Sequence, residues 1–470
     1  MTDTHVDDVV DGDRHTPWPA DSLDDSVLMP LWLDNPARPV ARQEASGALD
    51  TDLLVVGGGF TGLWTALRAV ERHPGRSVTL IEADRIAEHA TGRNGGFCEA
   101  SLTHGENNGR SRWPGEYDRL HALGVENLDG IEETIERHGI DCGFVRGGTL
   151  LVATRPHEVA GLEPEQEGFL DAASVRTVVD SPTYLAGRLH PDGCALVDPA
   201  RLAWGLAQTA ERLGVRIFEG TRLDALRRRD DGLEATTGAA VIRARRVVVA
   251  TNVFHDQFRR AKWSIVPVYD YVLATEPLTE AQLRSIGWDP SIGIADSGNQ
   301  FHYYRVTPDR RILWGGYDAI YHFGRSMADE HDDRRATFET LARNFAETFP
   351  QLQGIRFTHR WSGVIDTSTR FCAMFGTAHR GRAAYATGFT GLGVGASRFA
   401  ADVMLDLVDG ESTERTRLKM VRSKPLPFPP EPLAWLGIQV TRWAMAREDA
   451  TGRRNLWLRI LDRLGLGFDS

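Results

Sequence analysis

The 470-residue sequence has only four cysteines, and they are widely separated: Cys98, Cys142, Cys194 and Cys372. None belongs to a C-x-x-C pair, and no group of them has the spacing of a metal site. A disulfide scaffold is therefore excluded, and we expect no metal ion. Scattered free thiols are typical of a reducing compartment, so we expect a cytoplasmic protein.

Long apolar runs and an excess of basic residues are also missing. No stretch approaches the roughly 20 apolar residues that a membrane-spanning helix needs. The net charge of −11 argues against a nucleic-acid partner, which would favour a basic face. The acidic, polar N-terminus, MTDTHVDDVVDGDRH, is the opposite of a signal peptide. The chain is long enough for two domains, each with its own core.

What the sequence does contain is a glycine pattern for binding a dinucleotide. The apolar run at 53–56 predicts a buried parallel strand, and it stops at glycines. Gly57, Gly59 and Gly62 complete the G-x-G-x-x-G spacing. In that motif the first glycine allows a tight turn, the second admits a pyrophosphate, and the third lets the helix pack on the strand.

The residues after the glycines strengthen this interpretation over a chance glycine turn. Residues 61–70 have a helical pattern, so phosphates would lie at the positive helix N-terminus. A second strand at 77–81 ends at Glu82, which follows Gly62 by 82 − 62 = 20 residues. At this distance an acidic residue binds a ribose hydroxyl. We therefore predict a dinucleotide site.

Three features favour FAD over NAD. The chain has one G-x-G-x-x-G unit, and residues 150–300 offer no second unit for a pyridine nucleotide. Residues 243–252, RARRVVVATN, look like the strand that ends beside the adenine dinucleotide in two-domain flavoproteins. Residues 388–395, GFTGLGVG, open a helix whose backbone N–H groups can approach a flavin ring.

Seven sequence blocks resemble the D-amino-acid oxidase-like superfamily of FAD-dependent oxidoreductases, and most of all its gamma-glutamylputrescine oxidoreductase-type branch. They occur in family order between about residues 45 and 410. The blocks are VVGGGFTGLWTA at 55–66, IEAD at 81–84, ATGRNGG at 90–96, VVVATN at 247–252, YYRVTPDRRILWGG at 303–316, HRWSG at 359–363 and ATGFTGLGVG at 386–395.

This resemblance implies oxidation of a C–N bond by hydride transfer to flavin N5, giving an imine that water hydrolyses. It implies a small-molecule amine substrate, and O2 or another acceptor that reoxidises the flavin. The cofactor-binding residues implied are Gly57, Gly59, Phe60, Thr61, Gly62, Glu82, Ala83, Arg93, Asn94, Gly95, Gly96, Thr251, Asn252, Gly388, Thr390, Gly391, Leu392 and Gly393. For residues 93–96 the alternative is an ordinary surface turn, which Asn-Gly favours.

Predicted substrate-side residues are mostly aromatic, because aromatic walls attract an amine and exclude water. Tyr269 and Tyr271 share one face of a predicted strand, and residues 301–304 (FHYY) lie on another strand. The catalytic candidates are His302, Tyr304, Trp361 and Lys262. For each aromatic residue a packed sheet face is the alternative, and for His302 it is a structural histidine.

The chain differs from the amino-acid-oxidising members of the family in the residues that would bind a substrate carboxylate. We find no equivalent of their carboxylate-binding arginine, and Asp309 falls near its expected place. Arg305 is a candidate anion anchor, with a surface ion pair as the alternative. This favours amines over simple α-amino acids. The surroundings of Cys372 and His89 do not match flavin-attachment motifs, so we expect non-covalent FAD.

The predicted fold is α/β (α+β): a Rossmann-like FAD-binding domain, an inserted mixed β-sheet substrate domain, and a C-terminal helical arm. The arm would pack on its own domain or on a neighbouring subunit of an oligomer, or lie on a membrane surface. Alternative functions are an FAD-dependent monooxygenase and a non-catalytic flavin-fold protein. The predicted ranges are a tail at 1–45, an FAD-binding domain at 46–115, 190–255 and 361–410, a substrate-binding domain at 116–189 and 256–360, and the arm at 411–470.

Overall fold

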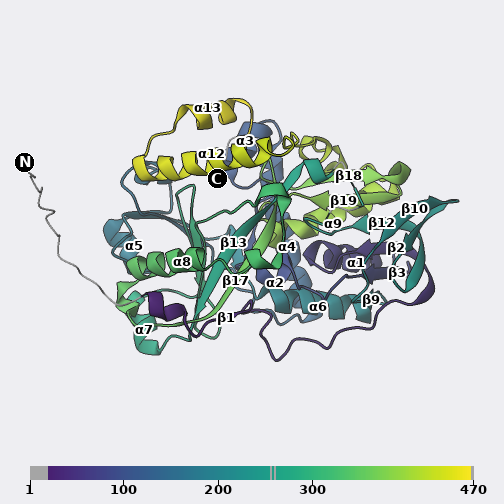
Figure 1. Ribbon diagram of the computed structural model, residues 1–470, viewed down its shortest axis with the longest axis horizontal. Helices are drawn as coiled ribbons and strands as arrows, with labels where there is room; N and C mark the ends of the chain where they lie inside the picture. The colour runs from purple at the N-terminus through teal and green to yellow at the C-terminus, as the bar shows by residue number, and fades with distance from the viewer. Residues whose placement is uncertain (1–18, 255–256, 259–260, 467–470) are drawn as a thin grey trace, which may run out of the picture.

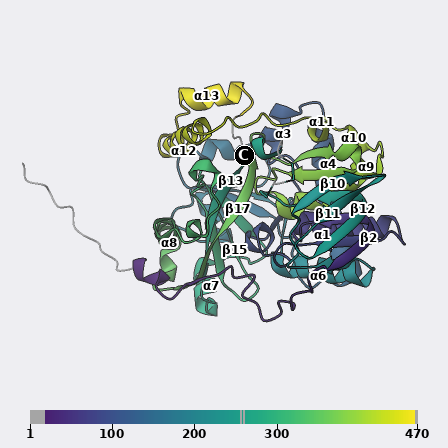
Figure 2. The same cartoon turned by 45° about the vertical axis from the view of Figure 1, so that its right-hand side comes forward.

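The computed structural model describes residues 19–254, 257–258 and 261–466. Two large β-sheets lie beside each other, each with its own helices (Figure 1). The first contains the strand that precedes the glycine motif, and the second contains the predicted substrate strands. Two C-terminal helices lie across one side of the second sheet (Figures 1 and 2). The α/β fold class predicted from the sequence is confirmed.

The first sheet is built around parallel strands. Its order is β10-β11-β12-β2-β3-β9, and β19, itself paired with β18, adds to β12 in parallel. Both faces of β2 are buried because alternate residues of the apolar run enter different clusters, Leu53 and Val55 on one face and Leu54 and Val56 on the other. The strands are β2 (Gly47–Val56), β3 (Val78–Ile81), β9 (Arg216–Phe218), β10 (Ala225–Arg229), β11 (Gly232–Thr236), β12 (Ala240–Val249), β18 (Met374–Ala378) and β19 (Ala383–Thr387).

Four helices contribute to the large cluster on one face of this sheet. The helix predicted at 61–70 is α1, which packs against α6 and α9, and α4 packs on α9. Helix α4 is continuous over 22 residues. The helices are α1 (Phe60–Arg72), α4 (Tyr117–His138), α6 (Pro199–Arg212) and α9 (Gly393–Asp409).

The second sheet has nine strands in the order β1-β17-β13-β16-β15-β14-β5-β7-β6. Its centre is antiparallel, and β13 pairs with β17 along almost its whole length. A small two-stranded sheet, β4 (Phe97–Glu99) with β8 (Cys194–Leu196), is separate. The nine strands are β1 (Val27–Leu28), β5 (Thr149–Ala153), β6 (Phe169–Asp171), β7 (Ala186–His190), β13 (Ile265–Thr275), β14 (Gly293–Asp296), β15 (His302–Val306), β16 (Ile312–Gly316) and β17 (Phe357–Ser368).

The two faces of the second sheet have different partners. One face packs under α8 in a cluster that includes Tyr271, Tyr304 and Trp314. The other face contributes Val272, Leu313 and Trp361 to the cluster of the first sheet. This second face is therefore the one turned toward the glycine motif. The remaining helices are α2 (Ala90–Arg93), α3 (Glu106–Arg112), α5 (Ala172–Val178), α7 (Glu280–Ile286), α8 (Arg335–Thr348), α10 (Glu414–Arg417), α11 (Lys419–Arg422), α12 (Leu433–Thr451) and α13 (Leu456–Arg463).

Two domain boundaries differ from those predicted. Strand β17 lies entirely in the second sheet, so the return to the first sheet comes after residue 368 rather than at 361. Helix α4 belongs to the first domain, because its apolar face packs on α9, although 116–189 was assigned to the substrate domain. Both differences arise because local sequence patterns do not show which sheet an element joins.

The N-terminal segment is partly built into the body. Trp32 and Leu33 of this segment are buried, while Leu28 and Met29 are exposed. Strand β1 pairs in parallel with β17 at the edge of the second sheet. Residues 1–18 lie outside the described residues. In the described part of the chain, no helix combines the length and apolar character needed to cross a bilayer.

Candidate FAD site and the adjoining face of the second sheet

Four adjacent parallel strands end at the same edge of the first sheet. Val56 pairs with Ile81 and with Val249, and Val249 pairs with Tyr385. The turns that follow these strands contain Gly57, Glu82, residues 250–252 and Gly388. In open parallel sheets, ligands bind in the crevice beyond the carboxyl ends of such strands.

The glycine motif permits a very close approach of three backbone segments. Gly57 has φ 112°, a conformation that L side chains rarely adopt, and an added Cβ would overlap the carbonyl oxygen of Ala250. At Gly62 an added Cβ would overlap the carbonyl oxygen of Gly57. Helix α1, which begins at Phe60, is thus held directly against the turn between β2 and the helix. Its N-terminal N–H groups face the carboxyl edge of the sheet.

Glu82 lies at the end of β3, where the sequence places it. Its side chain is buried and accepts hydrogen bonds from the backbone N–H groups of Gly58 and Asp84. Burial raises the pKa of the Glu82 carboxyl group above its usual value. The carboxylate therefore lies beside the glycine turn, whereas the neighbouring Ala83 is exposed.

Residues 93–96 form a fixed, inward segment and not an ordinary surface turn. Asn94 Oδ1 accepts from Gly96 N–H at 2.8 Å, and Asn94 Nδ2 donates to the carbonyl of Thr91 at 2.7 Å. A residue of the second sheet also holds this segment, because Trp361 Nε1 of β17 donates a hydrogen bond to the Arg93 carbonyl at 2.9 Å. Gly95 and Gly96 are buried.

The glycine turn at 388–393 is held by a residue that the sequence analysis missed, Asp366 at the end of β17. Its carboxylate accepts hydrogen bonds from the N–H groups of Gly388 and Phe389 and, at 3.0 Å, from the Thr387 hydroxyl. Burial raises the pKa of Asp366 to about 6. Gly388, Thr390 and Gly391 all have positive φ, so the turn needs such external support. In the sequence, Asp366 directly follows the apolar residues Val364 and Ile365, and this buried-strand context was the signal that could have identified it.

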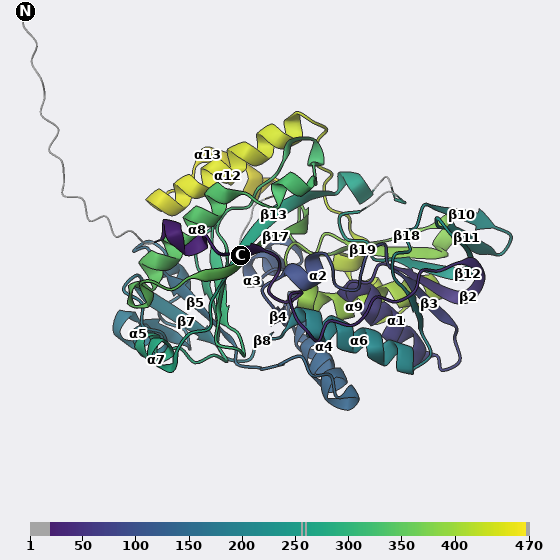
Figure 3. The ribbon, with the colours of Figure 1, turned by 60° about the horizontal axis from the view of Figure 1, so that its bottom comes forward.

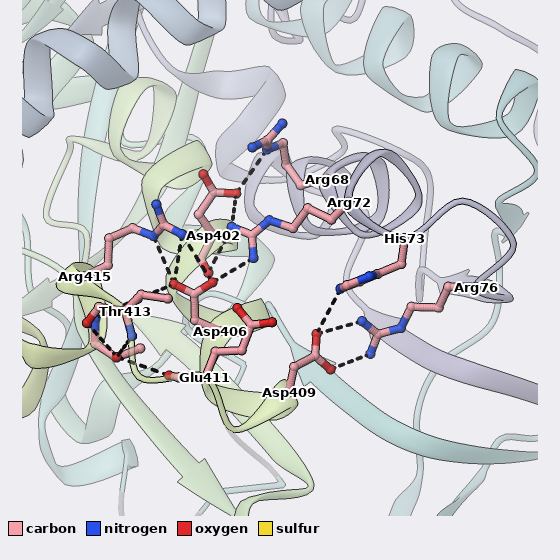
Figure 4. Close-up of polar contacts among 11 residues, drawn as sticks. Arg68, Arg72, His73, Arg76, Asp402, Asp406, Asp409, Glu411, Thr413 and Arg415 are labelled. Atoms are coloured by element: carbon pink, nitrogen blue, oxygen red, sulfur yellow. Dashed lines mark hydrogen bonds and ion pairs between the residues drawn. The ribbon is translucent and has the colours of Figure 1, made fainter.

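A ladder of ion pairs, which we call the α1–α9 ladder, joins the two helices that begin at these glycine turns (Figure 4). Arg68 and Arg72 of α1 are four residues apart, as are Asp402 and Asp406 of α9, so successive helical turns meet. Asp406 is fully buried and also receives Arg415 and the Thr413 hydroxyl. The helix-to-helix pairs are Arg68–Asp402 at 3.0 Å, Arg72–Asp402 at 2.7 Å and Arg72–Asp406 at 2.8 Å. Arg76, in the loop after α1, pairs with Asp409 at the end of α9 at 2.8 Å.

Opposite this edge, the second sheet presents a carboxylate and a phenol that bond to each other. Tyr303 of β15 donates to Asp270 of β13, and burial raises the pKa of Asp270 to about 6. The ring of Tyr303 lies against Gly95, where an added Cβ would come within 2.6 Å of it. Gly363 is paired opposite Asp270, so no side chain fills that position on β17. Asp270 was not among the residues predicted from the sequence, although a carboxylate inside an apolar strand was a visible signal.

His302 and Tyr304 do not lie on this face, because strand alternation turns them to the α8 side. His302 is buried, with Nδ1 2.6 Å from Asp296 and Nε2 3.0 Å from Asn344. Tyr304 bonds to the hydroxyl of Tyr184 at 2.8 Å. Both side chains are packed and hydrogen-bonded, which is the structural alternative to a catalytic role.

The remaining aromatic and basic candidates do not all lie at the same place in the structure. Trp361 is on the face toward residues 93–96, whereas Tyr269 and Tyr271 belong to the cluster under α8. Lys262 is exposed in a short turn, and its carbonyl accepts from Arg325. The structure thus brings Trp361 to the candidate site, but not Tyr269 or Tyr271.

The candidates for carboxylate binding and for flavin attachment make contacts that differ from those that either role would need. Arg305 is buried and donates to the carbonyls of Val197 at 2.7 Å and Gly96 at 3.2 Å, so it is neither a surface ion pair nor an open anion anchor. Asp309 pairs with Arg311 at the end of a hairpin. Cys372 is a buried free thiol, and His89 pairs with Asp84.

Comparison with known proteins identifies the family. The profile of the FAD dependent oxidoreductase family, DAO, matches residues 52–407, which is most of the chain. The chain belongs to this family. Gamma-glutamylputrescine oxidoreductase of Escherichia coli is 30% identical over 381 residues, covering 78% of this chain and 85% of the relative. A probable oxidoreductase, OrdL, of Haemophilus influenzae is 26% identical, covering 77% and 83% of the two chains.

Solved structures of two oxidases share the fold. Glycine oxidase from Geobacillus kaustophilus superimposes with a TM-score of 0.64 at 19% identity, covering 78% of this chain and 96% of that one. Iminodiacetate oxidase from Chelativorans gives a TM-score of 0.62 at 18% identity, covering 79% and 98%. The predicted family and the FAD cofactor are therefore confirmed.

The residues at the carboxyl edge fit FAD. Gly57 and Gly62 leave no room for a side chain, and Glu82 is beside them, as binding of the ADP half requires. Asn252 has positive φ beside this edge, and its Oδ1 is buried without a hydrogen-bond partner among the described residues. An unpaired buried acceptor indicates a missing donor. The residues that could hold FAD are Gly57–Gly62, Glu82, Thr251 and Asn252 for the ADP half, and 93–96 with 388–393 for the flavin.

Replacing Gly59 by Val is expected to weaken FAD binding about 10- to 100-fold. The added Cβ would lie 2.9 Å from Thr91 Oγ1, the atom that accepts from Phe60 N–H at the start of α1. Overpacking of this kind costs about 1–3 kcal/mol, and 1.4 kcal/mol is tenfold in affinity. The flavin-to-protein absorbance ratio after dialysis measures the loss. Gly238→Ala is the control, because its Cβ would meet nothing within 4 Å; equal FAD loss in both variants would refute the prediction.

Proposed function

We propose that this protein oxidises the C–N bond of an amine. The single observation that carries this proposal is the Asp270–Tyr303 pair on the face of the second sheet that adjoins residues 93–96. A carboxylate there complements an ammonium group and repels a substrate carboxylate. Bound FAD supplies the two-electron acceptor for the hydride that leaves the carbon next to nitrogen.

The protein's own part is to bind, orient and deprotonate the amine. Asp270 holds the ammonium group and accepts its proton, because a neutral amine is the form that releases hydride. Tyr303 fixes the carboxylate by donating to it, and its ring covers Gly95. After the ammonium group gives one proton to Asp270, loss of hydride from the neighbouring carbon leaves a protonated imine, and water converts it to a carbonyl compound and a protonated amine or ammonium.

The positions of nearby arginines support an amine over an α-amino acid. Arg305 is occupied by backbone carbonyls, and Arg93 donates to the carbonyls of Glu88 and Ser362 and pairs with Asp332. Neither guanidinium is arranged to grip a substrate carboxylate in the bidentate manner that arginine favours. The specificity proposed is therefore for amines or ω-amino compounds with any carboxylate far from the reacting nitrogen.

Anaerobic bleaching of the FAD-loaded protein tests this function. The panel contains polyamines and their acylated forms, N-methyl amino acids, D-amino acids and aminophosphonates. We expect at least one amine without an α-carboxylate to bleach the yellow protein, and admission of air then separates an oxidase from a dehydrogenase. Failure of every amine to bleach an FAD-loaded sample would overturn the proposal, and bleaching by NADPH with a hydroxylated product would indicate a monooxygenase.

A further inference from the structure

The C-terminal helices present apolar side chains to solvent in an ordered pattern. Helices α12 and α13 lie next to each other on the outside of the molecule (Figures 1 and 3). On α12 the exposed apolar residues are spaced three, four and three apart, so they share one face. We call them the outer stripe: Leu433, Leu436, Val440 and Trp443, with exposed fractions of 60%, 48%, 43% and 60%.

Helix α13 extends this apolar surface. Leu456, Ile460 and Leu464 are four residues apart, and all are exposed, Leu456 by 73%. Trp457 is also exposed, and its Nε1 donates to Thr441 of α12 at 3.0 Å, which ties the two helices together. Apolar patches of this extent rarely stay in contact with water unless they serve an interaction.

The outer stripe faces outward because polar bonds fix the opposite side of α12 to the body. The buried carboxylate of Asp449 accepts from the N–H groups of Asn299 and Gln300, each at 2.9 Å. Arg442 pairs with Asp318, and Gln439 donates to the carbonyl of Tyr321 at 3.3 Å. These bonds determine the rotation of the helix, so the exposed leucines and tryptophan are a fixed feature of its surface.

The arm is basic in a chain whose net charge is −11. Between residues 433 and 464 it has six arginines and three acids, a net of 6 − 3 = +3. All three acids are used internally, since Asp449 caps backbone groups and Glu448 and Asp462 pair with Arg454. Four arginines form no ion pair with any described residue and are exposed: Arg447, Arg453, Arg459 and Arg463.

An arginine-lined pocket lies where the outer stripe ends. Arg447 continues the line of the stripe one turn beyond Trp443, and its guanidinium lies 5.7 Å from the centre of that ring. With Arg453, Arg454 and Asn455 it lines a pocket of about 360 Å³. Guanidinium groups beside an apolar surface are suited to the phosphate groups of lipids.

We propose that the outer stripe and α13 dock on an anionic phospholipid surface, with the helices lying in the plane of the interface. Leucine and tryptophan side chains enter the headgroup region, and the free arginines contact lipid phosphates. The charge favours this partner over a second copy of the chain. A symmetric dimer through this face would bring the same unpaired arginines together.

Vesicle flotation of the full-length FAD-loaded protein tests this proposal. We expect binding to vesicles of phosphatidylcholine with 30% phosphatidylglycerol, and little binding to phosphatidylcholine alone. Raising NaCl from 0.1 to 0.5 M should reduce binding, because salt screens exposed charges. Replacing Arg447 or Arg453 by Ala should weaken binding about fivefold each, and Trp443→Ser should weaken it further.

Matched controls separate docking from misfolding. Arg284→Ala removes an exposed arginine from α7 and should leave vesicle binding unchanged, and thermal unfolding should show that every variant is folded. Absence of binding to anionic vesicles at low salt would overturn the proposal. So would a concentration-dependent dimer that Trp443→Ser abolishes without any vesicle binding, because the stripe would then be an interface between copies.

Discussion

In the Asp270→Asn protein, the rate of anaerobic flavin reduction by the preferred amine is expected to fall about 10²- to 10⁴-fold. This is the usual contribution of a positioned proton acceptor. Asparagine keeps the size of the side chain and can still accept from Tyr303, but it cannot take a proton from the ammonium group. Stopped-flow absorbance of the FAD-loaded variant measures the rate, and its FAD content should be unchanged.

The pH dependence gives a second readout of the same residue. Because burial raises the pKa of Asp270 to about 6, the carboxylate is protonated below that pH and available above it. The reduction rate of the natural protein should therefore rise with pH, reach half of its maximum near pH 6, and level off above that as Asp270 becomes fully ionised. The rise should be absent in Asp270→Asn. Asp309→Asn, at an exposed hairpin end, is the control that should keep both rate and profile. Reduction of Asp270→Asn at the natural rate would remove Asp270 from the mechanism, while bleaching by an amine would still support the function.

The Asp406→Ala protein is expected to lose about 3–5 kcal/mol of unfolding free energy, the usual cost of breaking a buried ion pair by removing one partner. Asp406 is fully buried and accepts from Arg72, Arg415 and Thr413. Without the Asp406 carboxylate, Asp402 is the acid of the α1–α9 ladder that still pairs with the Arg72 guanidinium (Figure 4). Urea unfolding of the FAD-free protein measures the change without the contribution of cofactor binding.

The same substitution should also accelerate FAD loss, because the ladder aligns the two helices that begin at the glycine turns. Arg284→Ala provides the comparison, since the exposed Arg284–Glu280 pair is worth about 0–1 kcal/mol. If both variants unfold at the same urea concentration, the ladder does not stabilise the domain.

Local sequence patterns predicted the dinucleotide unit closely. The apolar run, the three glycines and Glu82 each act through neighbouring residues, so strand β2, helix α1 and the acid lie where the spacing placed them. The family resemblance and FAD followed from blocks of this kind. Boundaries such as the end of β17 at Ser368 were missed, because a strand's own residues do not show which sheet it joins.

The substrate side was less predictable because it depends on which face of a strand points inward. The FHYY run offered His302, Tyr303 and Tyr304 together, but alternation sends only Tyr303 to the face that adjoins Gly95. Asp270 lies between Tyr269 and Tyr271, which were predicted as substrate-side residues, and its importance depends on pairing with Tyr303 on a different strand.

The sequence alone determined the kind of cofactor and the fold of the unit proposed to bind its ADP half, because those features are contiguous and their spacing is set by one turn and one helix. Tertiary structure decided the rest through contacts between residues far apart in the chain. Asp366 supports a turn 22 residues later, and Arg72 meets Asp406 across 334 residues. Such pairs form only when sheets and helices have packed, and they define the shape and charge of the surface that an amine would meet.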